Sequence, residues 1–152
     1  MTTTTALPDD GFITLVSWPD ALSDATGHPV RSEYVERFWL GILGPTATWL
    51  LRRCSDEVQA NPTGAVVDLH PMAGSIGLAY HAGRPNPFSR GFDRLIMFGM
   101  MRHVGNHPRP TFAVRTRVPP LAGRQLARLP EQLQIAHADF LMQQHGDLSA
   151  TH

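Results

Sequence analysis

The chain has 152 residues, of which 42% are hydrophobic and 17% are charged, and its formal net charge is zero. These values are typical of one globular domain. The sequence has no apolar run of roughly 18 residues, which a membrane-spanning helix needs, no secretory-signal pattern at its polar N-terminus, and no second cysteine to pair with Cys54. We therefore exclude a membrane-spanning chain and a disulfide-stapled one, and we expect a cytoplasmic protein.

The charges are segregated along the chain. Residues 69–130 hold nine of the 13 arginines and a single acid, Asp93, whereas residues 1–68 hold four arginines against nine acids, and residues 131–152 hold three acids and no arginine. The middle segment therefore carries about +8, between flanks of about −5 and −3. The sequence has no lysine, so each fixed positive charge is a guanidinium, which binds phosphate bidentately and can also read guanine edges.

The N-terminal third predicts a strand-like segment followed by two helices. Residues 12–22 (FITLVSWPDAL) start as a strand and turn at Trp-Pro, and we expect them to pack on the domain or on a partner subunit. Ser32 is a candidate N-cap for the first helix. Gly44 and Pro45 interrupt that helix, and proline suits the first position of the next one, which extends to about Val58.

A strand and a short helix are predicted next. Turn residues at 61–64 end the preceding helix. The β-branched run 65–69 (AVVDL) is too short for a helix and predicts a strand. A small helix is expected over 70–78, although two glycines weaken it.

Residues 86–97 (NPFSRGFDRLIM) show the clearest local pattern. Asn86 suits an N-cap and Pro87 suits the first helical position. The apolar stripe expected to face a core consists of Phe88, Phe92, Leu95, Ile96 and Gly99. The residues off this stripe are Ser89, Arg90, Asp93, Arg94 and Met97. Arg90 and Arg94 lie one turn apart and repel each other unless an anion lies between them; a solvated face with an internal ion pair is the alternative.

A β-hairpin and a terminal helix complete the predicted elements. Residues 100–104 and 111–118 show strand patterns, and the Gly- and Pro-containing segment 105–110 joins them. A last helix is expected over 123–143, bent or restarted at Pro130. Its apolar stripe consists of Leu126, Leu129, Leu133, Ala136, Phe140 and Leu141.

These elements predict a mostly α-helical fold with a small antiparallel sheet, that is, an α+β fold. The strand at 65–69 needs a partner, and the hairpin would supply it in a three-stranded sheet. The order of elements resembles the winged helix-turn-helix superfamily of DNA-binding proteins. The stretches LGPTATWLL, AVVDL, SIGL and FG are similar to winged-helix domains of plasmid and phage replication initiators and to short uncharacterised actinobacterial regulators. This resemblance covers residues 34–143.

The resemblance also implies a division of the chain and a role for each helix. The parts are an N-terminal extension at 1–31, a winged-helix domain with extra N- and C-terminal helices at 32–143, and a flexible tail at 144–152. The implied roles are a positioning helix at 70–78, a recognition helix at 86–98 in the major groove, and a wing at 100–118 with its tip at 105–110. The turn AYHAGRPN is longer than the turn of a standard helix-turn-helix.

The function implied is sequence-specific binding of double-stranded DNA, as expected of a nucleoid-associated transcriptional regulator. The residues predicted to contact DNA are Arg84, Asn86, Ser89, Arg90, Asp93, Arg94, Arg109, Arg115 and Arg117. The residues of the helix would meet base edges, and the other arginines would meet phosphates or the minor groove. A homodimer through residues 125–143 would place two recognition helices about one DNA turn apart.

The sequence also bears on functions other than DNA binding. The sequence has no C-x-x-C, and its one H-x-x-x-H pair, His103 and His107, lies across a predicted hairpin turn instead of on one face of a helix, so we expect no metal and no other cofactor. The chain has neither a phosphate-cradling loop nor a G-x-S-x-G motif, so we expect no enzyme. The main alternative is a winged helix that binds a protein partner instead of DNA, through its acidic termini or through the region of Trp18, Trp39 and Trp49. Loss of Arg90 and Arg94 would separate these readings, since only a DNA binder depends on them.

Overall fold

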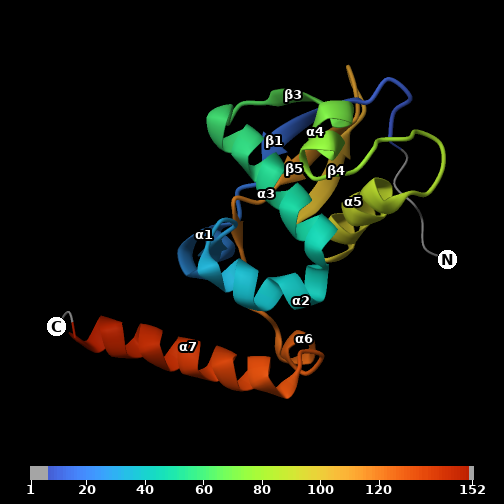
Figure 1. Ribbon diagram of the computed structural model, residues 1–152. Helices are drawn as coiled ribbons and strands as arrows, with labels where there is room; N and C mark the ends of the chain where they lie inside the picture. The colour runs from blue at the N-terminus through green and yellow to red at the C-terminus, as the bar shows by residue number, and fades with distance from the viewer. Residues whose placement is uncertain (1–6, 151–152) are drawn as a thin grey trace.

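The computed structural model describes residues 7–150, which form a four-stranded sheet covered by helices on one face and a long C-terminal helix set apart from the sheet (Figure 1). The predicted α+β class is confirmed. The strands are β1 (Phe12–Ser17), β2 (His28–Pro29), β3 (Ala65–Asp68), β4 (Met101–Gly105), β5 (Thr111–Val114) and β6 (Arg117–Val118). The helices are α1 (Ala21–Thr26), the π-helical η1 (Val35–Trp39), α2 (Leu40–Leu43), α3 (Pro45–Ala60), α4 (Leu69–Ser75), α5 (Pro87–Met97), α6 (Gly123–Leu126) and α7 (Glu131–Ala150).

The sheet differs from the predicted one in its centre. Its strand order is β3-β1-β5-β4, in which β1 pairs antiparallel with β3 and parallel with β5. The expectation that strand 65–69 pairs with the hairpin is therefore wrong, because β1 lies between them. The physical reason is burial. Ile13 and Leu15, at alternate positions of β1, are fully buried in the core, so a central position in the sheet stabilises the fold by removing these side chains from water.

The predicted strand at 111–118 divides between two sheets. Residues 111–114 form β5 in the main sheet, and β6 then pairs with β2 in a separate two-stranded sheet. Arg115 and Thr116 make the transition: the amide of Arg115 still donates to Met100, whereas the carbonyl of Thr116 already accepts from Val30. The N-terminal region is thus bound to the hairpin at two places, through β1 and through β2.

Helices α3 and α5 cover one face of the sheet and pack against each other. The break that starts α3 depends on Gly44, whose φ of 84° favours glycine, and on Pro45 at the first helical position. Gly91 of α5 allows a close helix approach, since a Cβ there would lie 2.8 Å from Cγ2 of Thr46. The core contact between α5 and the sheet is aromatic: Phe92 packs edge-on against Phe112 of β5, with ring centroids 4.9 Å apart.

Helix α7 is fixed to the body by a buried hydrogen-bond chain. The hydroxyl of Tyr34 accepts from the amide of Leu121 at 2.9 Å and contacts Nε2 of His137 at 2.8 Å. Burial lowers the pKa of His137 and raises the pKa of Tyr34. Both side chains are therefore neutral, and the imidazole accepts a hydrogen bond from the tyrosine hydroxyl. His28 stacks on the other side of this tyrosine, at 3.8 Å between ring centroids. Burial is also the main cause of the lowered pKa of His28.

The C-terminal helix restarts after Pro130, one of the two predicted alternatives, so that this proline separates α6 from α7. It differs from its prediction at its end, because α7 continues to Ala150 through most of the segment expected to be a tail. Residues 1–6 of the predicted N-terminal extension and residues 151–152 of the tail lie outside the described residues. Within residues 7–150, no helix combines the length and apolar character needed to cross a membrane.

Candidate nucleic-acid interface

Helix α5 presents one polar, arginine-bearing face to solvent. Its core-facing side chains, Phe88, Phe92 and Leu95, are fully buried, whereas Arg90 and Arg94 are exposed one turn apart. Asp93 is half-buried on the same helix. The predicted core-facing stripe and the outward positions of Arg90, Arg94 and Met97 are therefore confirmed, whereas Ser89, predicted to lie off the stripe, is buried.

The start of α5 is held by its own side chains. Oδ1 of Asn86 accepts from the amide of Ser89 at 3.0 Å, and Oγ of Ser89 accepts from the amide of Asn86 at 3.0 Å, which completes a capping box. The Asn86 side-chain amide also donates to the carbonyls of His81 and Arg84. Both side chains are buried. The sequence predicted the N-cap, but these two polar groups are already engaged inside the protein and are not available to base edges.

The side chain of Arg94 is exposed, but its guanidinium also forms hydrogen bonds within the protein. Its guanidinium donates from Nη2 to the carbonyl of Ile42 at 2.7 Å and from Nε to the same oxygen at 3.3 Å. It also stacks over Phe98, 5.3 Å from the ring centroid. Because this carbonyl belongs to the end of α2, Arg94 ties α5 to the helix that precedes α3.

Arg115 is a structural residue and not a free phosphate ligand. Nε donates to the carbonyl of Gly99 at 2.6 Å, Nη1 donates to the carboxylate of Asp20 at 2.7 Å, and the guanidinium lies 4.0 Å from the centroid of Trp18. The side chain is only 12% exposed. The hydrogen bond from Arg115 is the main reason that the pKa of Asp20 lies below its usual range. These contacts correct the predicted DNA-binding role of Arg115.

Arg117 is likewise engaged within the protein. Nη2 donates to the carbonyl of Gly27 at 2.7 Å, and this residue of β6 is half-buried. The sequence placed this arginine on the outer face of a hairpin. It instead follows the point where the chain leaves the main sheet, so the predicted contact with phosphate is not supported by its position.

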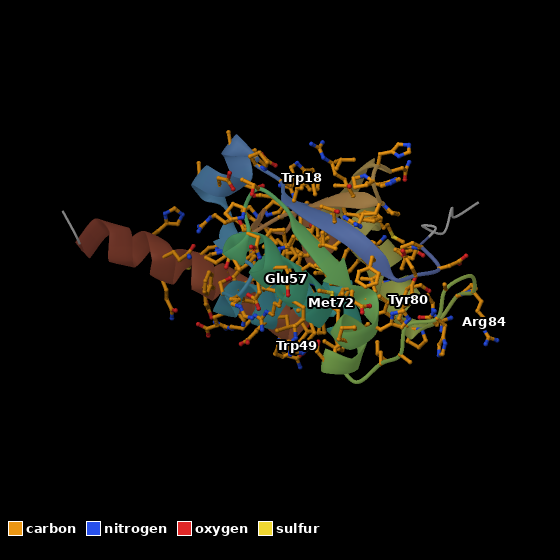
Figure 2. The ribbon with its side chains drawn as sticks, turned by 90° about the horizontal axis from the view of Figure 1, so that it is seen from above. Trp18, Trp49, Glu57, Met72, Tyr80 and Arg84 are labelled. Atoms are coloured by element: carbon orange, nitrogen blue, oxygen red, sulfur yellow. The ribbon has the colours of Figure 1, made fainter. Side chains whose placement is uncertain are left out.

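The remaining predicted arginines lie in the loop before α5 and in the loop that joins β4 to β5. Arg84 is exposed in the loop before the helix and projects from the body (Figure 2). Arg109 is half-exposed in the loop that joins β4 to β5, the predicted wing tip. Among the residues that the structure describes, no ion pair involves Arg84, Arg90 or Arg109. These three cations are therefore available to an external anion.

Arg102 was missed by the sequence reasoning. It is exposed on β4 and stacks over Trp18, 4.6 Å from the ring centroid, and Arg115 contacts the same ring. Only Met101 of β4 is buried, and Arg102, His103 and Val104 are all exposed, so a period of two in the sequence would not have identified Arg102. Exposed imidazoles of His103 and His107 lie on the same hairpin.

No triad of His, Cys, Asp and Glu side chains within the described residues could hold a metal ion. The thiol of Cys54 is buried against Met72, and burial raises its pKa far above its ordinary value, which leaves it protonated and unreactive.

Comparisons with known proteins give one structural relative. No protein-family model and no curated protein sequence matches the chain. The fold is similar to the crystal structure of primosome protein DnaB (residues 1–300) from Geobacillus stearothermophilus, with a TM-score of 0.50 and 16% sequence identity. The match covers 93% of this chain but 52% of that one, so the chain spans about half the length of the relative. At this identity the likeness shows a shared fold.

Proposed function

We propose that the protein binds double-stranded DNA, with α5 in the major groove and the β4–β5 hairpin on the phosphate backbone or in the minor groove. The observation that carries this proposal is that three arginines, Arg84 before α5, Arg90 on α5 and Arg109 on the β4–β5 loop, form no ion pair with any residue between 7 and 150. Asp93 is the single acid in residues 69–130, so a polyanion would meet little repulsion there. Binding rather than catalysis is the proposed activity.

The proposed DNA contacts differ among these arginines. Arg90 lies in the first turn of α5, where a recognition helix meets base edges, and its guanidinium is suited to guanine. Arg84, Arg102 and Arg109 lie before the helix and on the hairpin, where side chains meet phosphates on either side of the groove. Arg94 adds positive charge to this surface while its guanidinium donates to the carbonyl of Ile42.

The similar fold of a primosome protein supports a DNA-related or protein-binding role. Of these roles, we propose that the protein is a sequence-specific regulator of transcription. A role in DNA replication is the second candidate. The proposal of sequence specificity rests on Arg90 alone among the helix residues, because the caps Asn86 and Ser89 are engaged in the fold.

The test is fluorescence anisotropy of a mixed-sequence DNA duplex titrated with the protein over a series of salt concentrations. If four phosphates are neutralised, the slope of log affinity against log salt should be about −3.6. Arg90→Ala should weaken binding by about 1–3 kcal/mol. Arg128→Ala removes the same charge from an exposed site after α6 and is the matched control; it should leave the affinity nearly unchanged.

Two results would count against DNA binding: no anisotropy change at low salt, or equal affinities for Arg90→Ala and Arg128→Ala. The favoured function would then be a protein-interaction module. A specific observation supports that alternative, since Trp49 is exposed on α3 with Arg52 and Arg53 stacked on its ring. Such aromatic and arginine side chains are typical of interface hot spots.

The proposed homodimer uses a different face of α7 from the predicted one. The predicted stripe, including Leu129, Leu133 and Phe140, packs on the core of the same chain. Ile135 and Met142, which are two turns apart, remain 56% and 71% exposed. A helix with apolar residues on both sides is commonly buried on both sides, so we propose that this second stripe meets its copy on another chain.

Light scattering should therefore give the mass of a dimer at micromolar concentration, and Met142→Glu should reduce it to the monomer mass. Gln143→Glu adds the same charge at the neighbouring exposed position and should leave the dimer intact. A monomer mass for the unmodified protein at that concentration would refute this contact.

A further inference from the structure

The edge of the sheet formed by β3 borders a hollow that the proposed DNA interface does not use. The hollow has a volume of about 350 Å³ and lies between β3, α3 and α4. In Figure 2, Glu57 and Met72 lie on the side of β3 opposite β1. β4, which carries the proposed wing, is at the other end of the strand order. A ligand at β3 and DNA at the hairpin would therefore bind at different edges of the sheet.

The β3 edge lacks the usual protection against pairing with another strand. Within residues 7–150, β3 pairs with β1 alone, so its second side has no strand neighbour. Proteins commonly block such an edge with proline, a charged side chain or a bulge. The first three residues of β3 are Ala65, Val66 and Val67, none of which blocks pairing, and Val66 is 57% exposed.

The walls of the hollow are apolar at one part and acidic at another. Pro71, Met72 and Val67 supply apolar surface. Three carboxylates, those of Asp56, Glu57 and Asp68, line the hollow against one guanidinium, Arg53. This combination matches a long basic side chain, whose stem packs on apolar surface while its head meets a carboxylate.

Glu57 is the carboxylate best placed for such a contact. Asp56 is bound bidentately by Arg31, and Asp68 caps α4 and binds His70. Glu57 forms no ion pair with any residue between 7 and 150. A cation entering the hollow would therefore find one carboxylate whose charge is not already neutralised.

We propose that β3 is a docking edge for an extended basic segment of a protein partner. The segment adds as a strand beside β3, in the manner of β-strand addition, and inserts an arginine or lysine side chain between Met72 and Glu57. Main-chain hydrogen bonds supply the affinity, and the acidic hollow supplies the preference for a basic residue.

The probe is a fluorescein-labelled peptide of roughly seven residues, an ordinary strand length, in which valine and threonine alternate around a central arginine. Fluorescence polarisation with the full chain should show saturable binding. A peptide with glutamate in place of the central arginine should bind at least roughly tenfold more weakly, because like charges meet in the hollow. Amide shifts in ¹⁵N NMR spectra should centre on residues 65–68.

The matched protein variants are Glu57→Gln, which should weaken binding of the arginine peptide roughly tenfold, and Glu131→Gln, which removes the same charge at an exposed position of α7 and should have no effect. If Glu57→Gln fails to fold, the two peptides still test the proposal on the unmodified chain. Arg90→Ala should bind the peptide normally, so a failure of DNA binding and a failure of this site give different results.

Several outcomes would overturn the proposal. These are no binding at millimolar protein, equal affinity for the arginine and glutamate peptides, or amide shifts centred on β4. Self-association that Val66→Lys abolishes would show that a second copy of the chain occupies the edge, and would also overturn it.

Discussion

Phe92→Ala is expected to destabilise the protein by about 3–5 kcal/mol, the usual cost of removing a buried aromatic side chain. Phe92 is fully buried on α5 and lies between Phe88 of its own helix and Phe112 of the sheet. Its loss leaves a cavity where α5 docks. Thermal unfolding followed by circular dichroism should show a melting temperature lower by roughly 10 °C, since a domain of this size loses about 2–4 °C per kcal/mol.

The matched control is Met97→Ala on the exposed side of the same helix, which should change stability by no more than about 0.5 kcal/mol. At temperatures where Phe92→Ala is still folded, its DNA affinity should also fall, because α5 is then less firmly held. A melting temperature equal to that of the unmodified protein would show that the aromatic contact does not hold α5 to the sheet.

Arg115→Ala is expected to be the second most damaging change, with a loss of at least about 2 kcal/mol from the hydrogen bond to Gly99 and the stacking on Trp18. The carboxylate of Asp20 also loses its partner. The region from Trp18 to α1 should then become more flexible, and limited proteolysis should cleave it faster than in the unmodified protein. Urea unfolding would measure the change in stability.

The control is Arg109→Ala, for which the expected changes in stability and in DNA affinity differ from those of Arg115→Ala. It removes an arginine that forms no ion pair within residues 7–150, so stability should stay nearly constant while DNA affinity falls. Normal stability combined with weak DNA binding in Arg115→Ala would contradict the structural role assigned to that residue and restore it to the proposed interface.

The comparison of sequence with structure shows that local signals were reliable for α5. Asn86, Pro87 and the apolar spacing of Phe88 and Phe92 act within a few residues of one another, so the sequence alone locates the start of this helix and its buried face. The predicted order from α3 through β3, α4, α5, β4 and β5 is also confirmed. These elements depend on caps, breakers and periodicity, which leave short-range patterns.

Long-range pairing left no comparable signal. The sequence identified residues 12–17 as strand-like but did not show that they enter the sheet between β3 and β5, because parallel pairing of distant segments depends on tertiary packing. The same limit applies to the arginines. Composition counted Arg115 and Arg117 as available cations, whereas their partners, Asp20 and Gly27, lie about 90 positions earlier in the chain.

The central position of β1 determines when the sheet can be completed during synthesis. Its register pairs Ser17 with Val114, so 97 positions separate residues that become neighbours. At about 5–20 residues per second, β5 follows β1 from the ribosome after roughly 5–20 s. During this delay β3 is the available partner for β1, and the antiparallel β1–β3 pair can form against α3. The hairpin of β4 and β5 can join β1 only after β5 has left the ribosome, so the hairpin and its arginines enter the sheet after the β1–β3 pair can have formed.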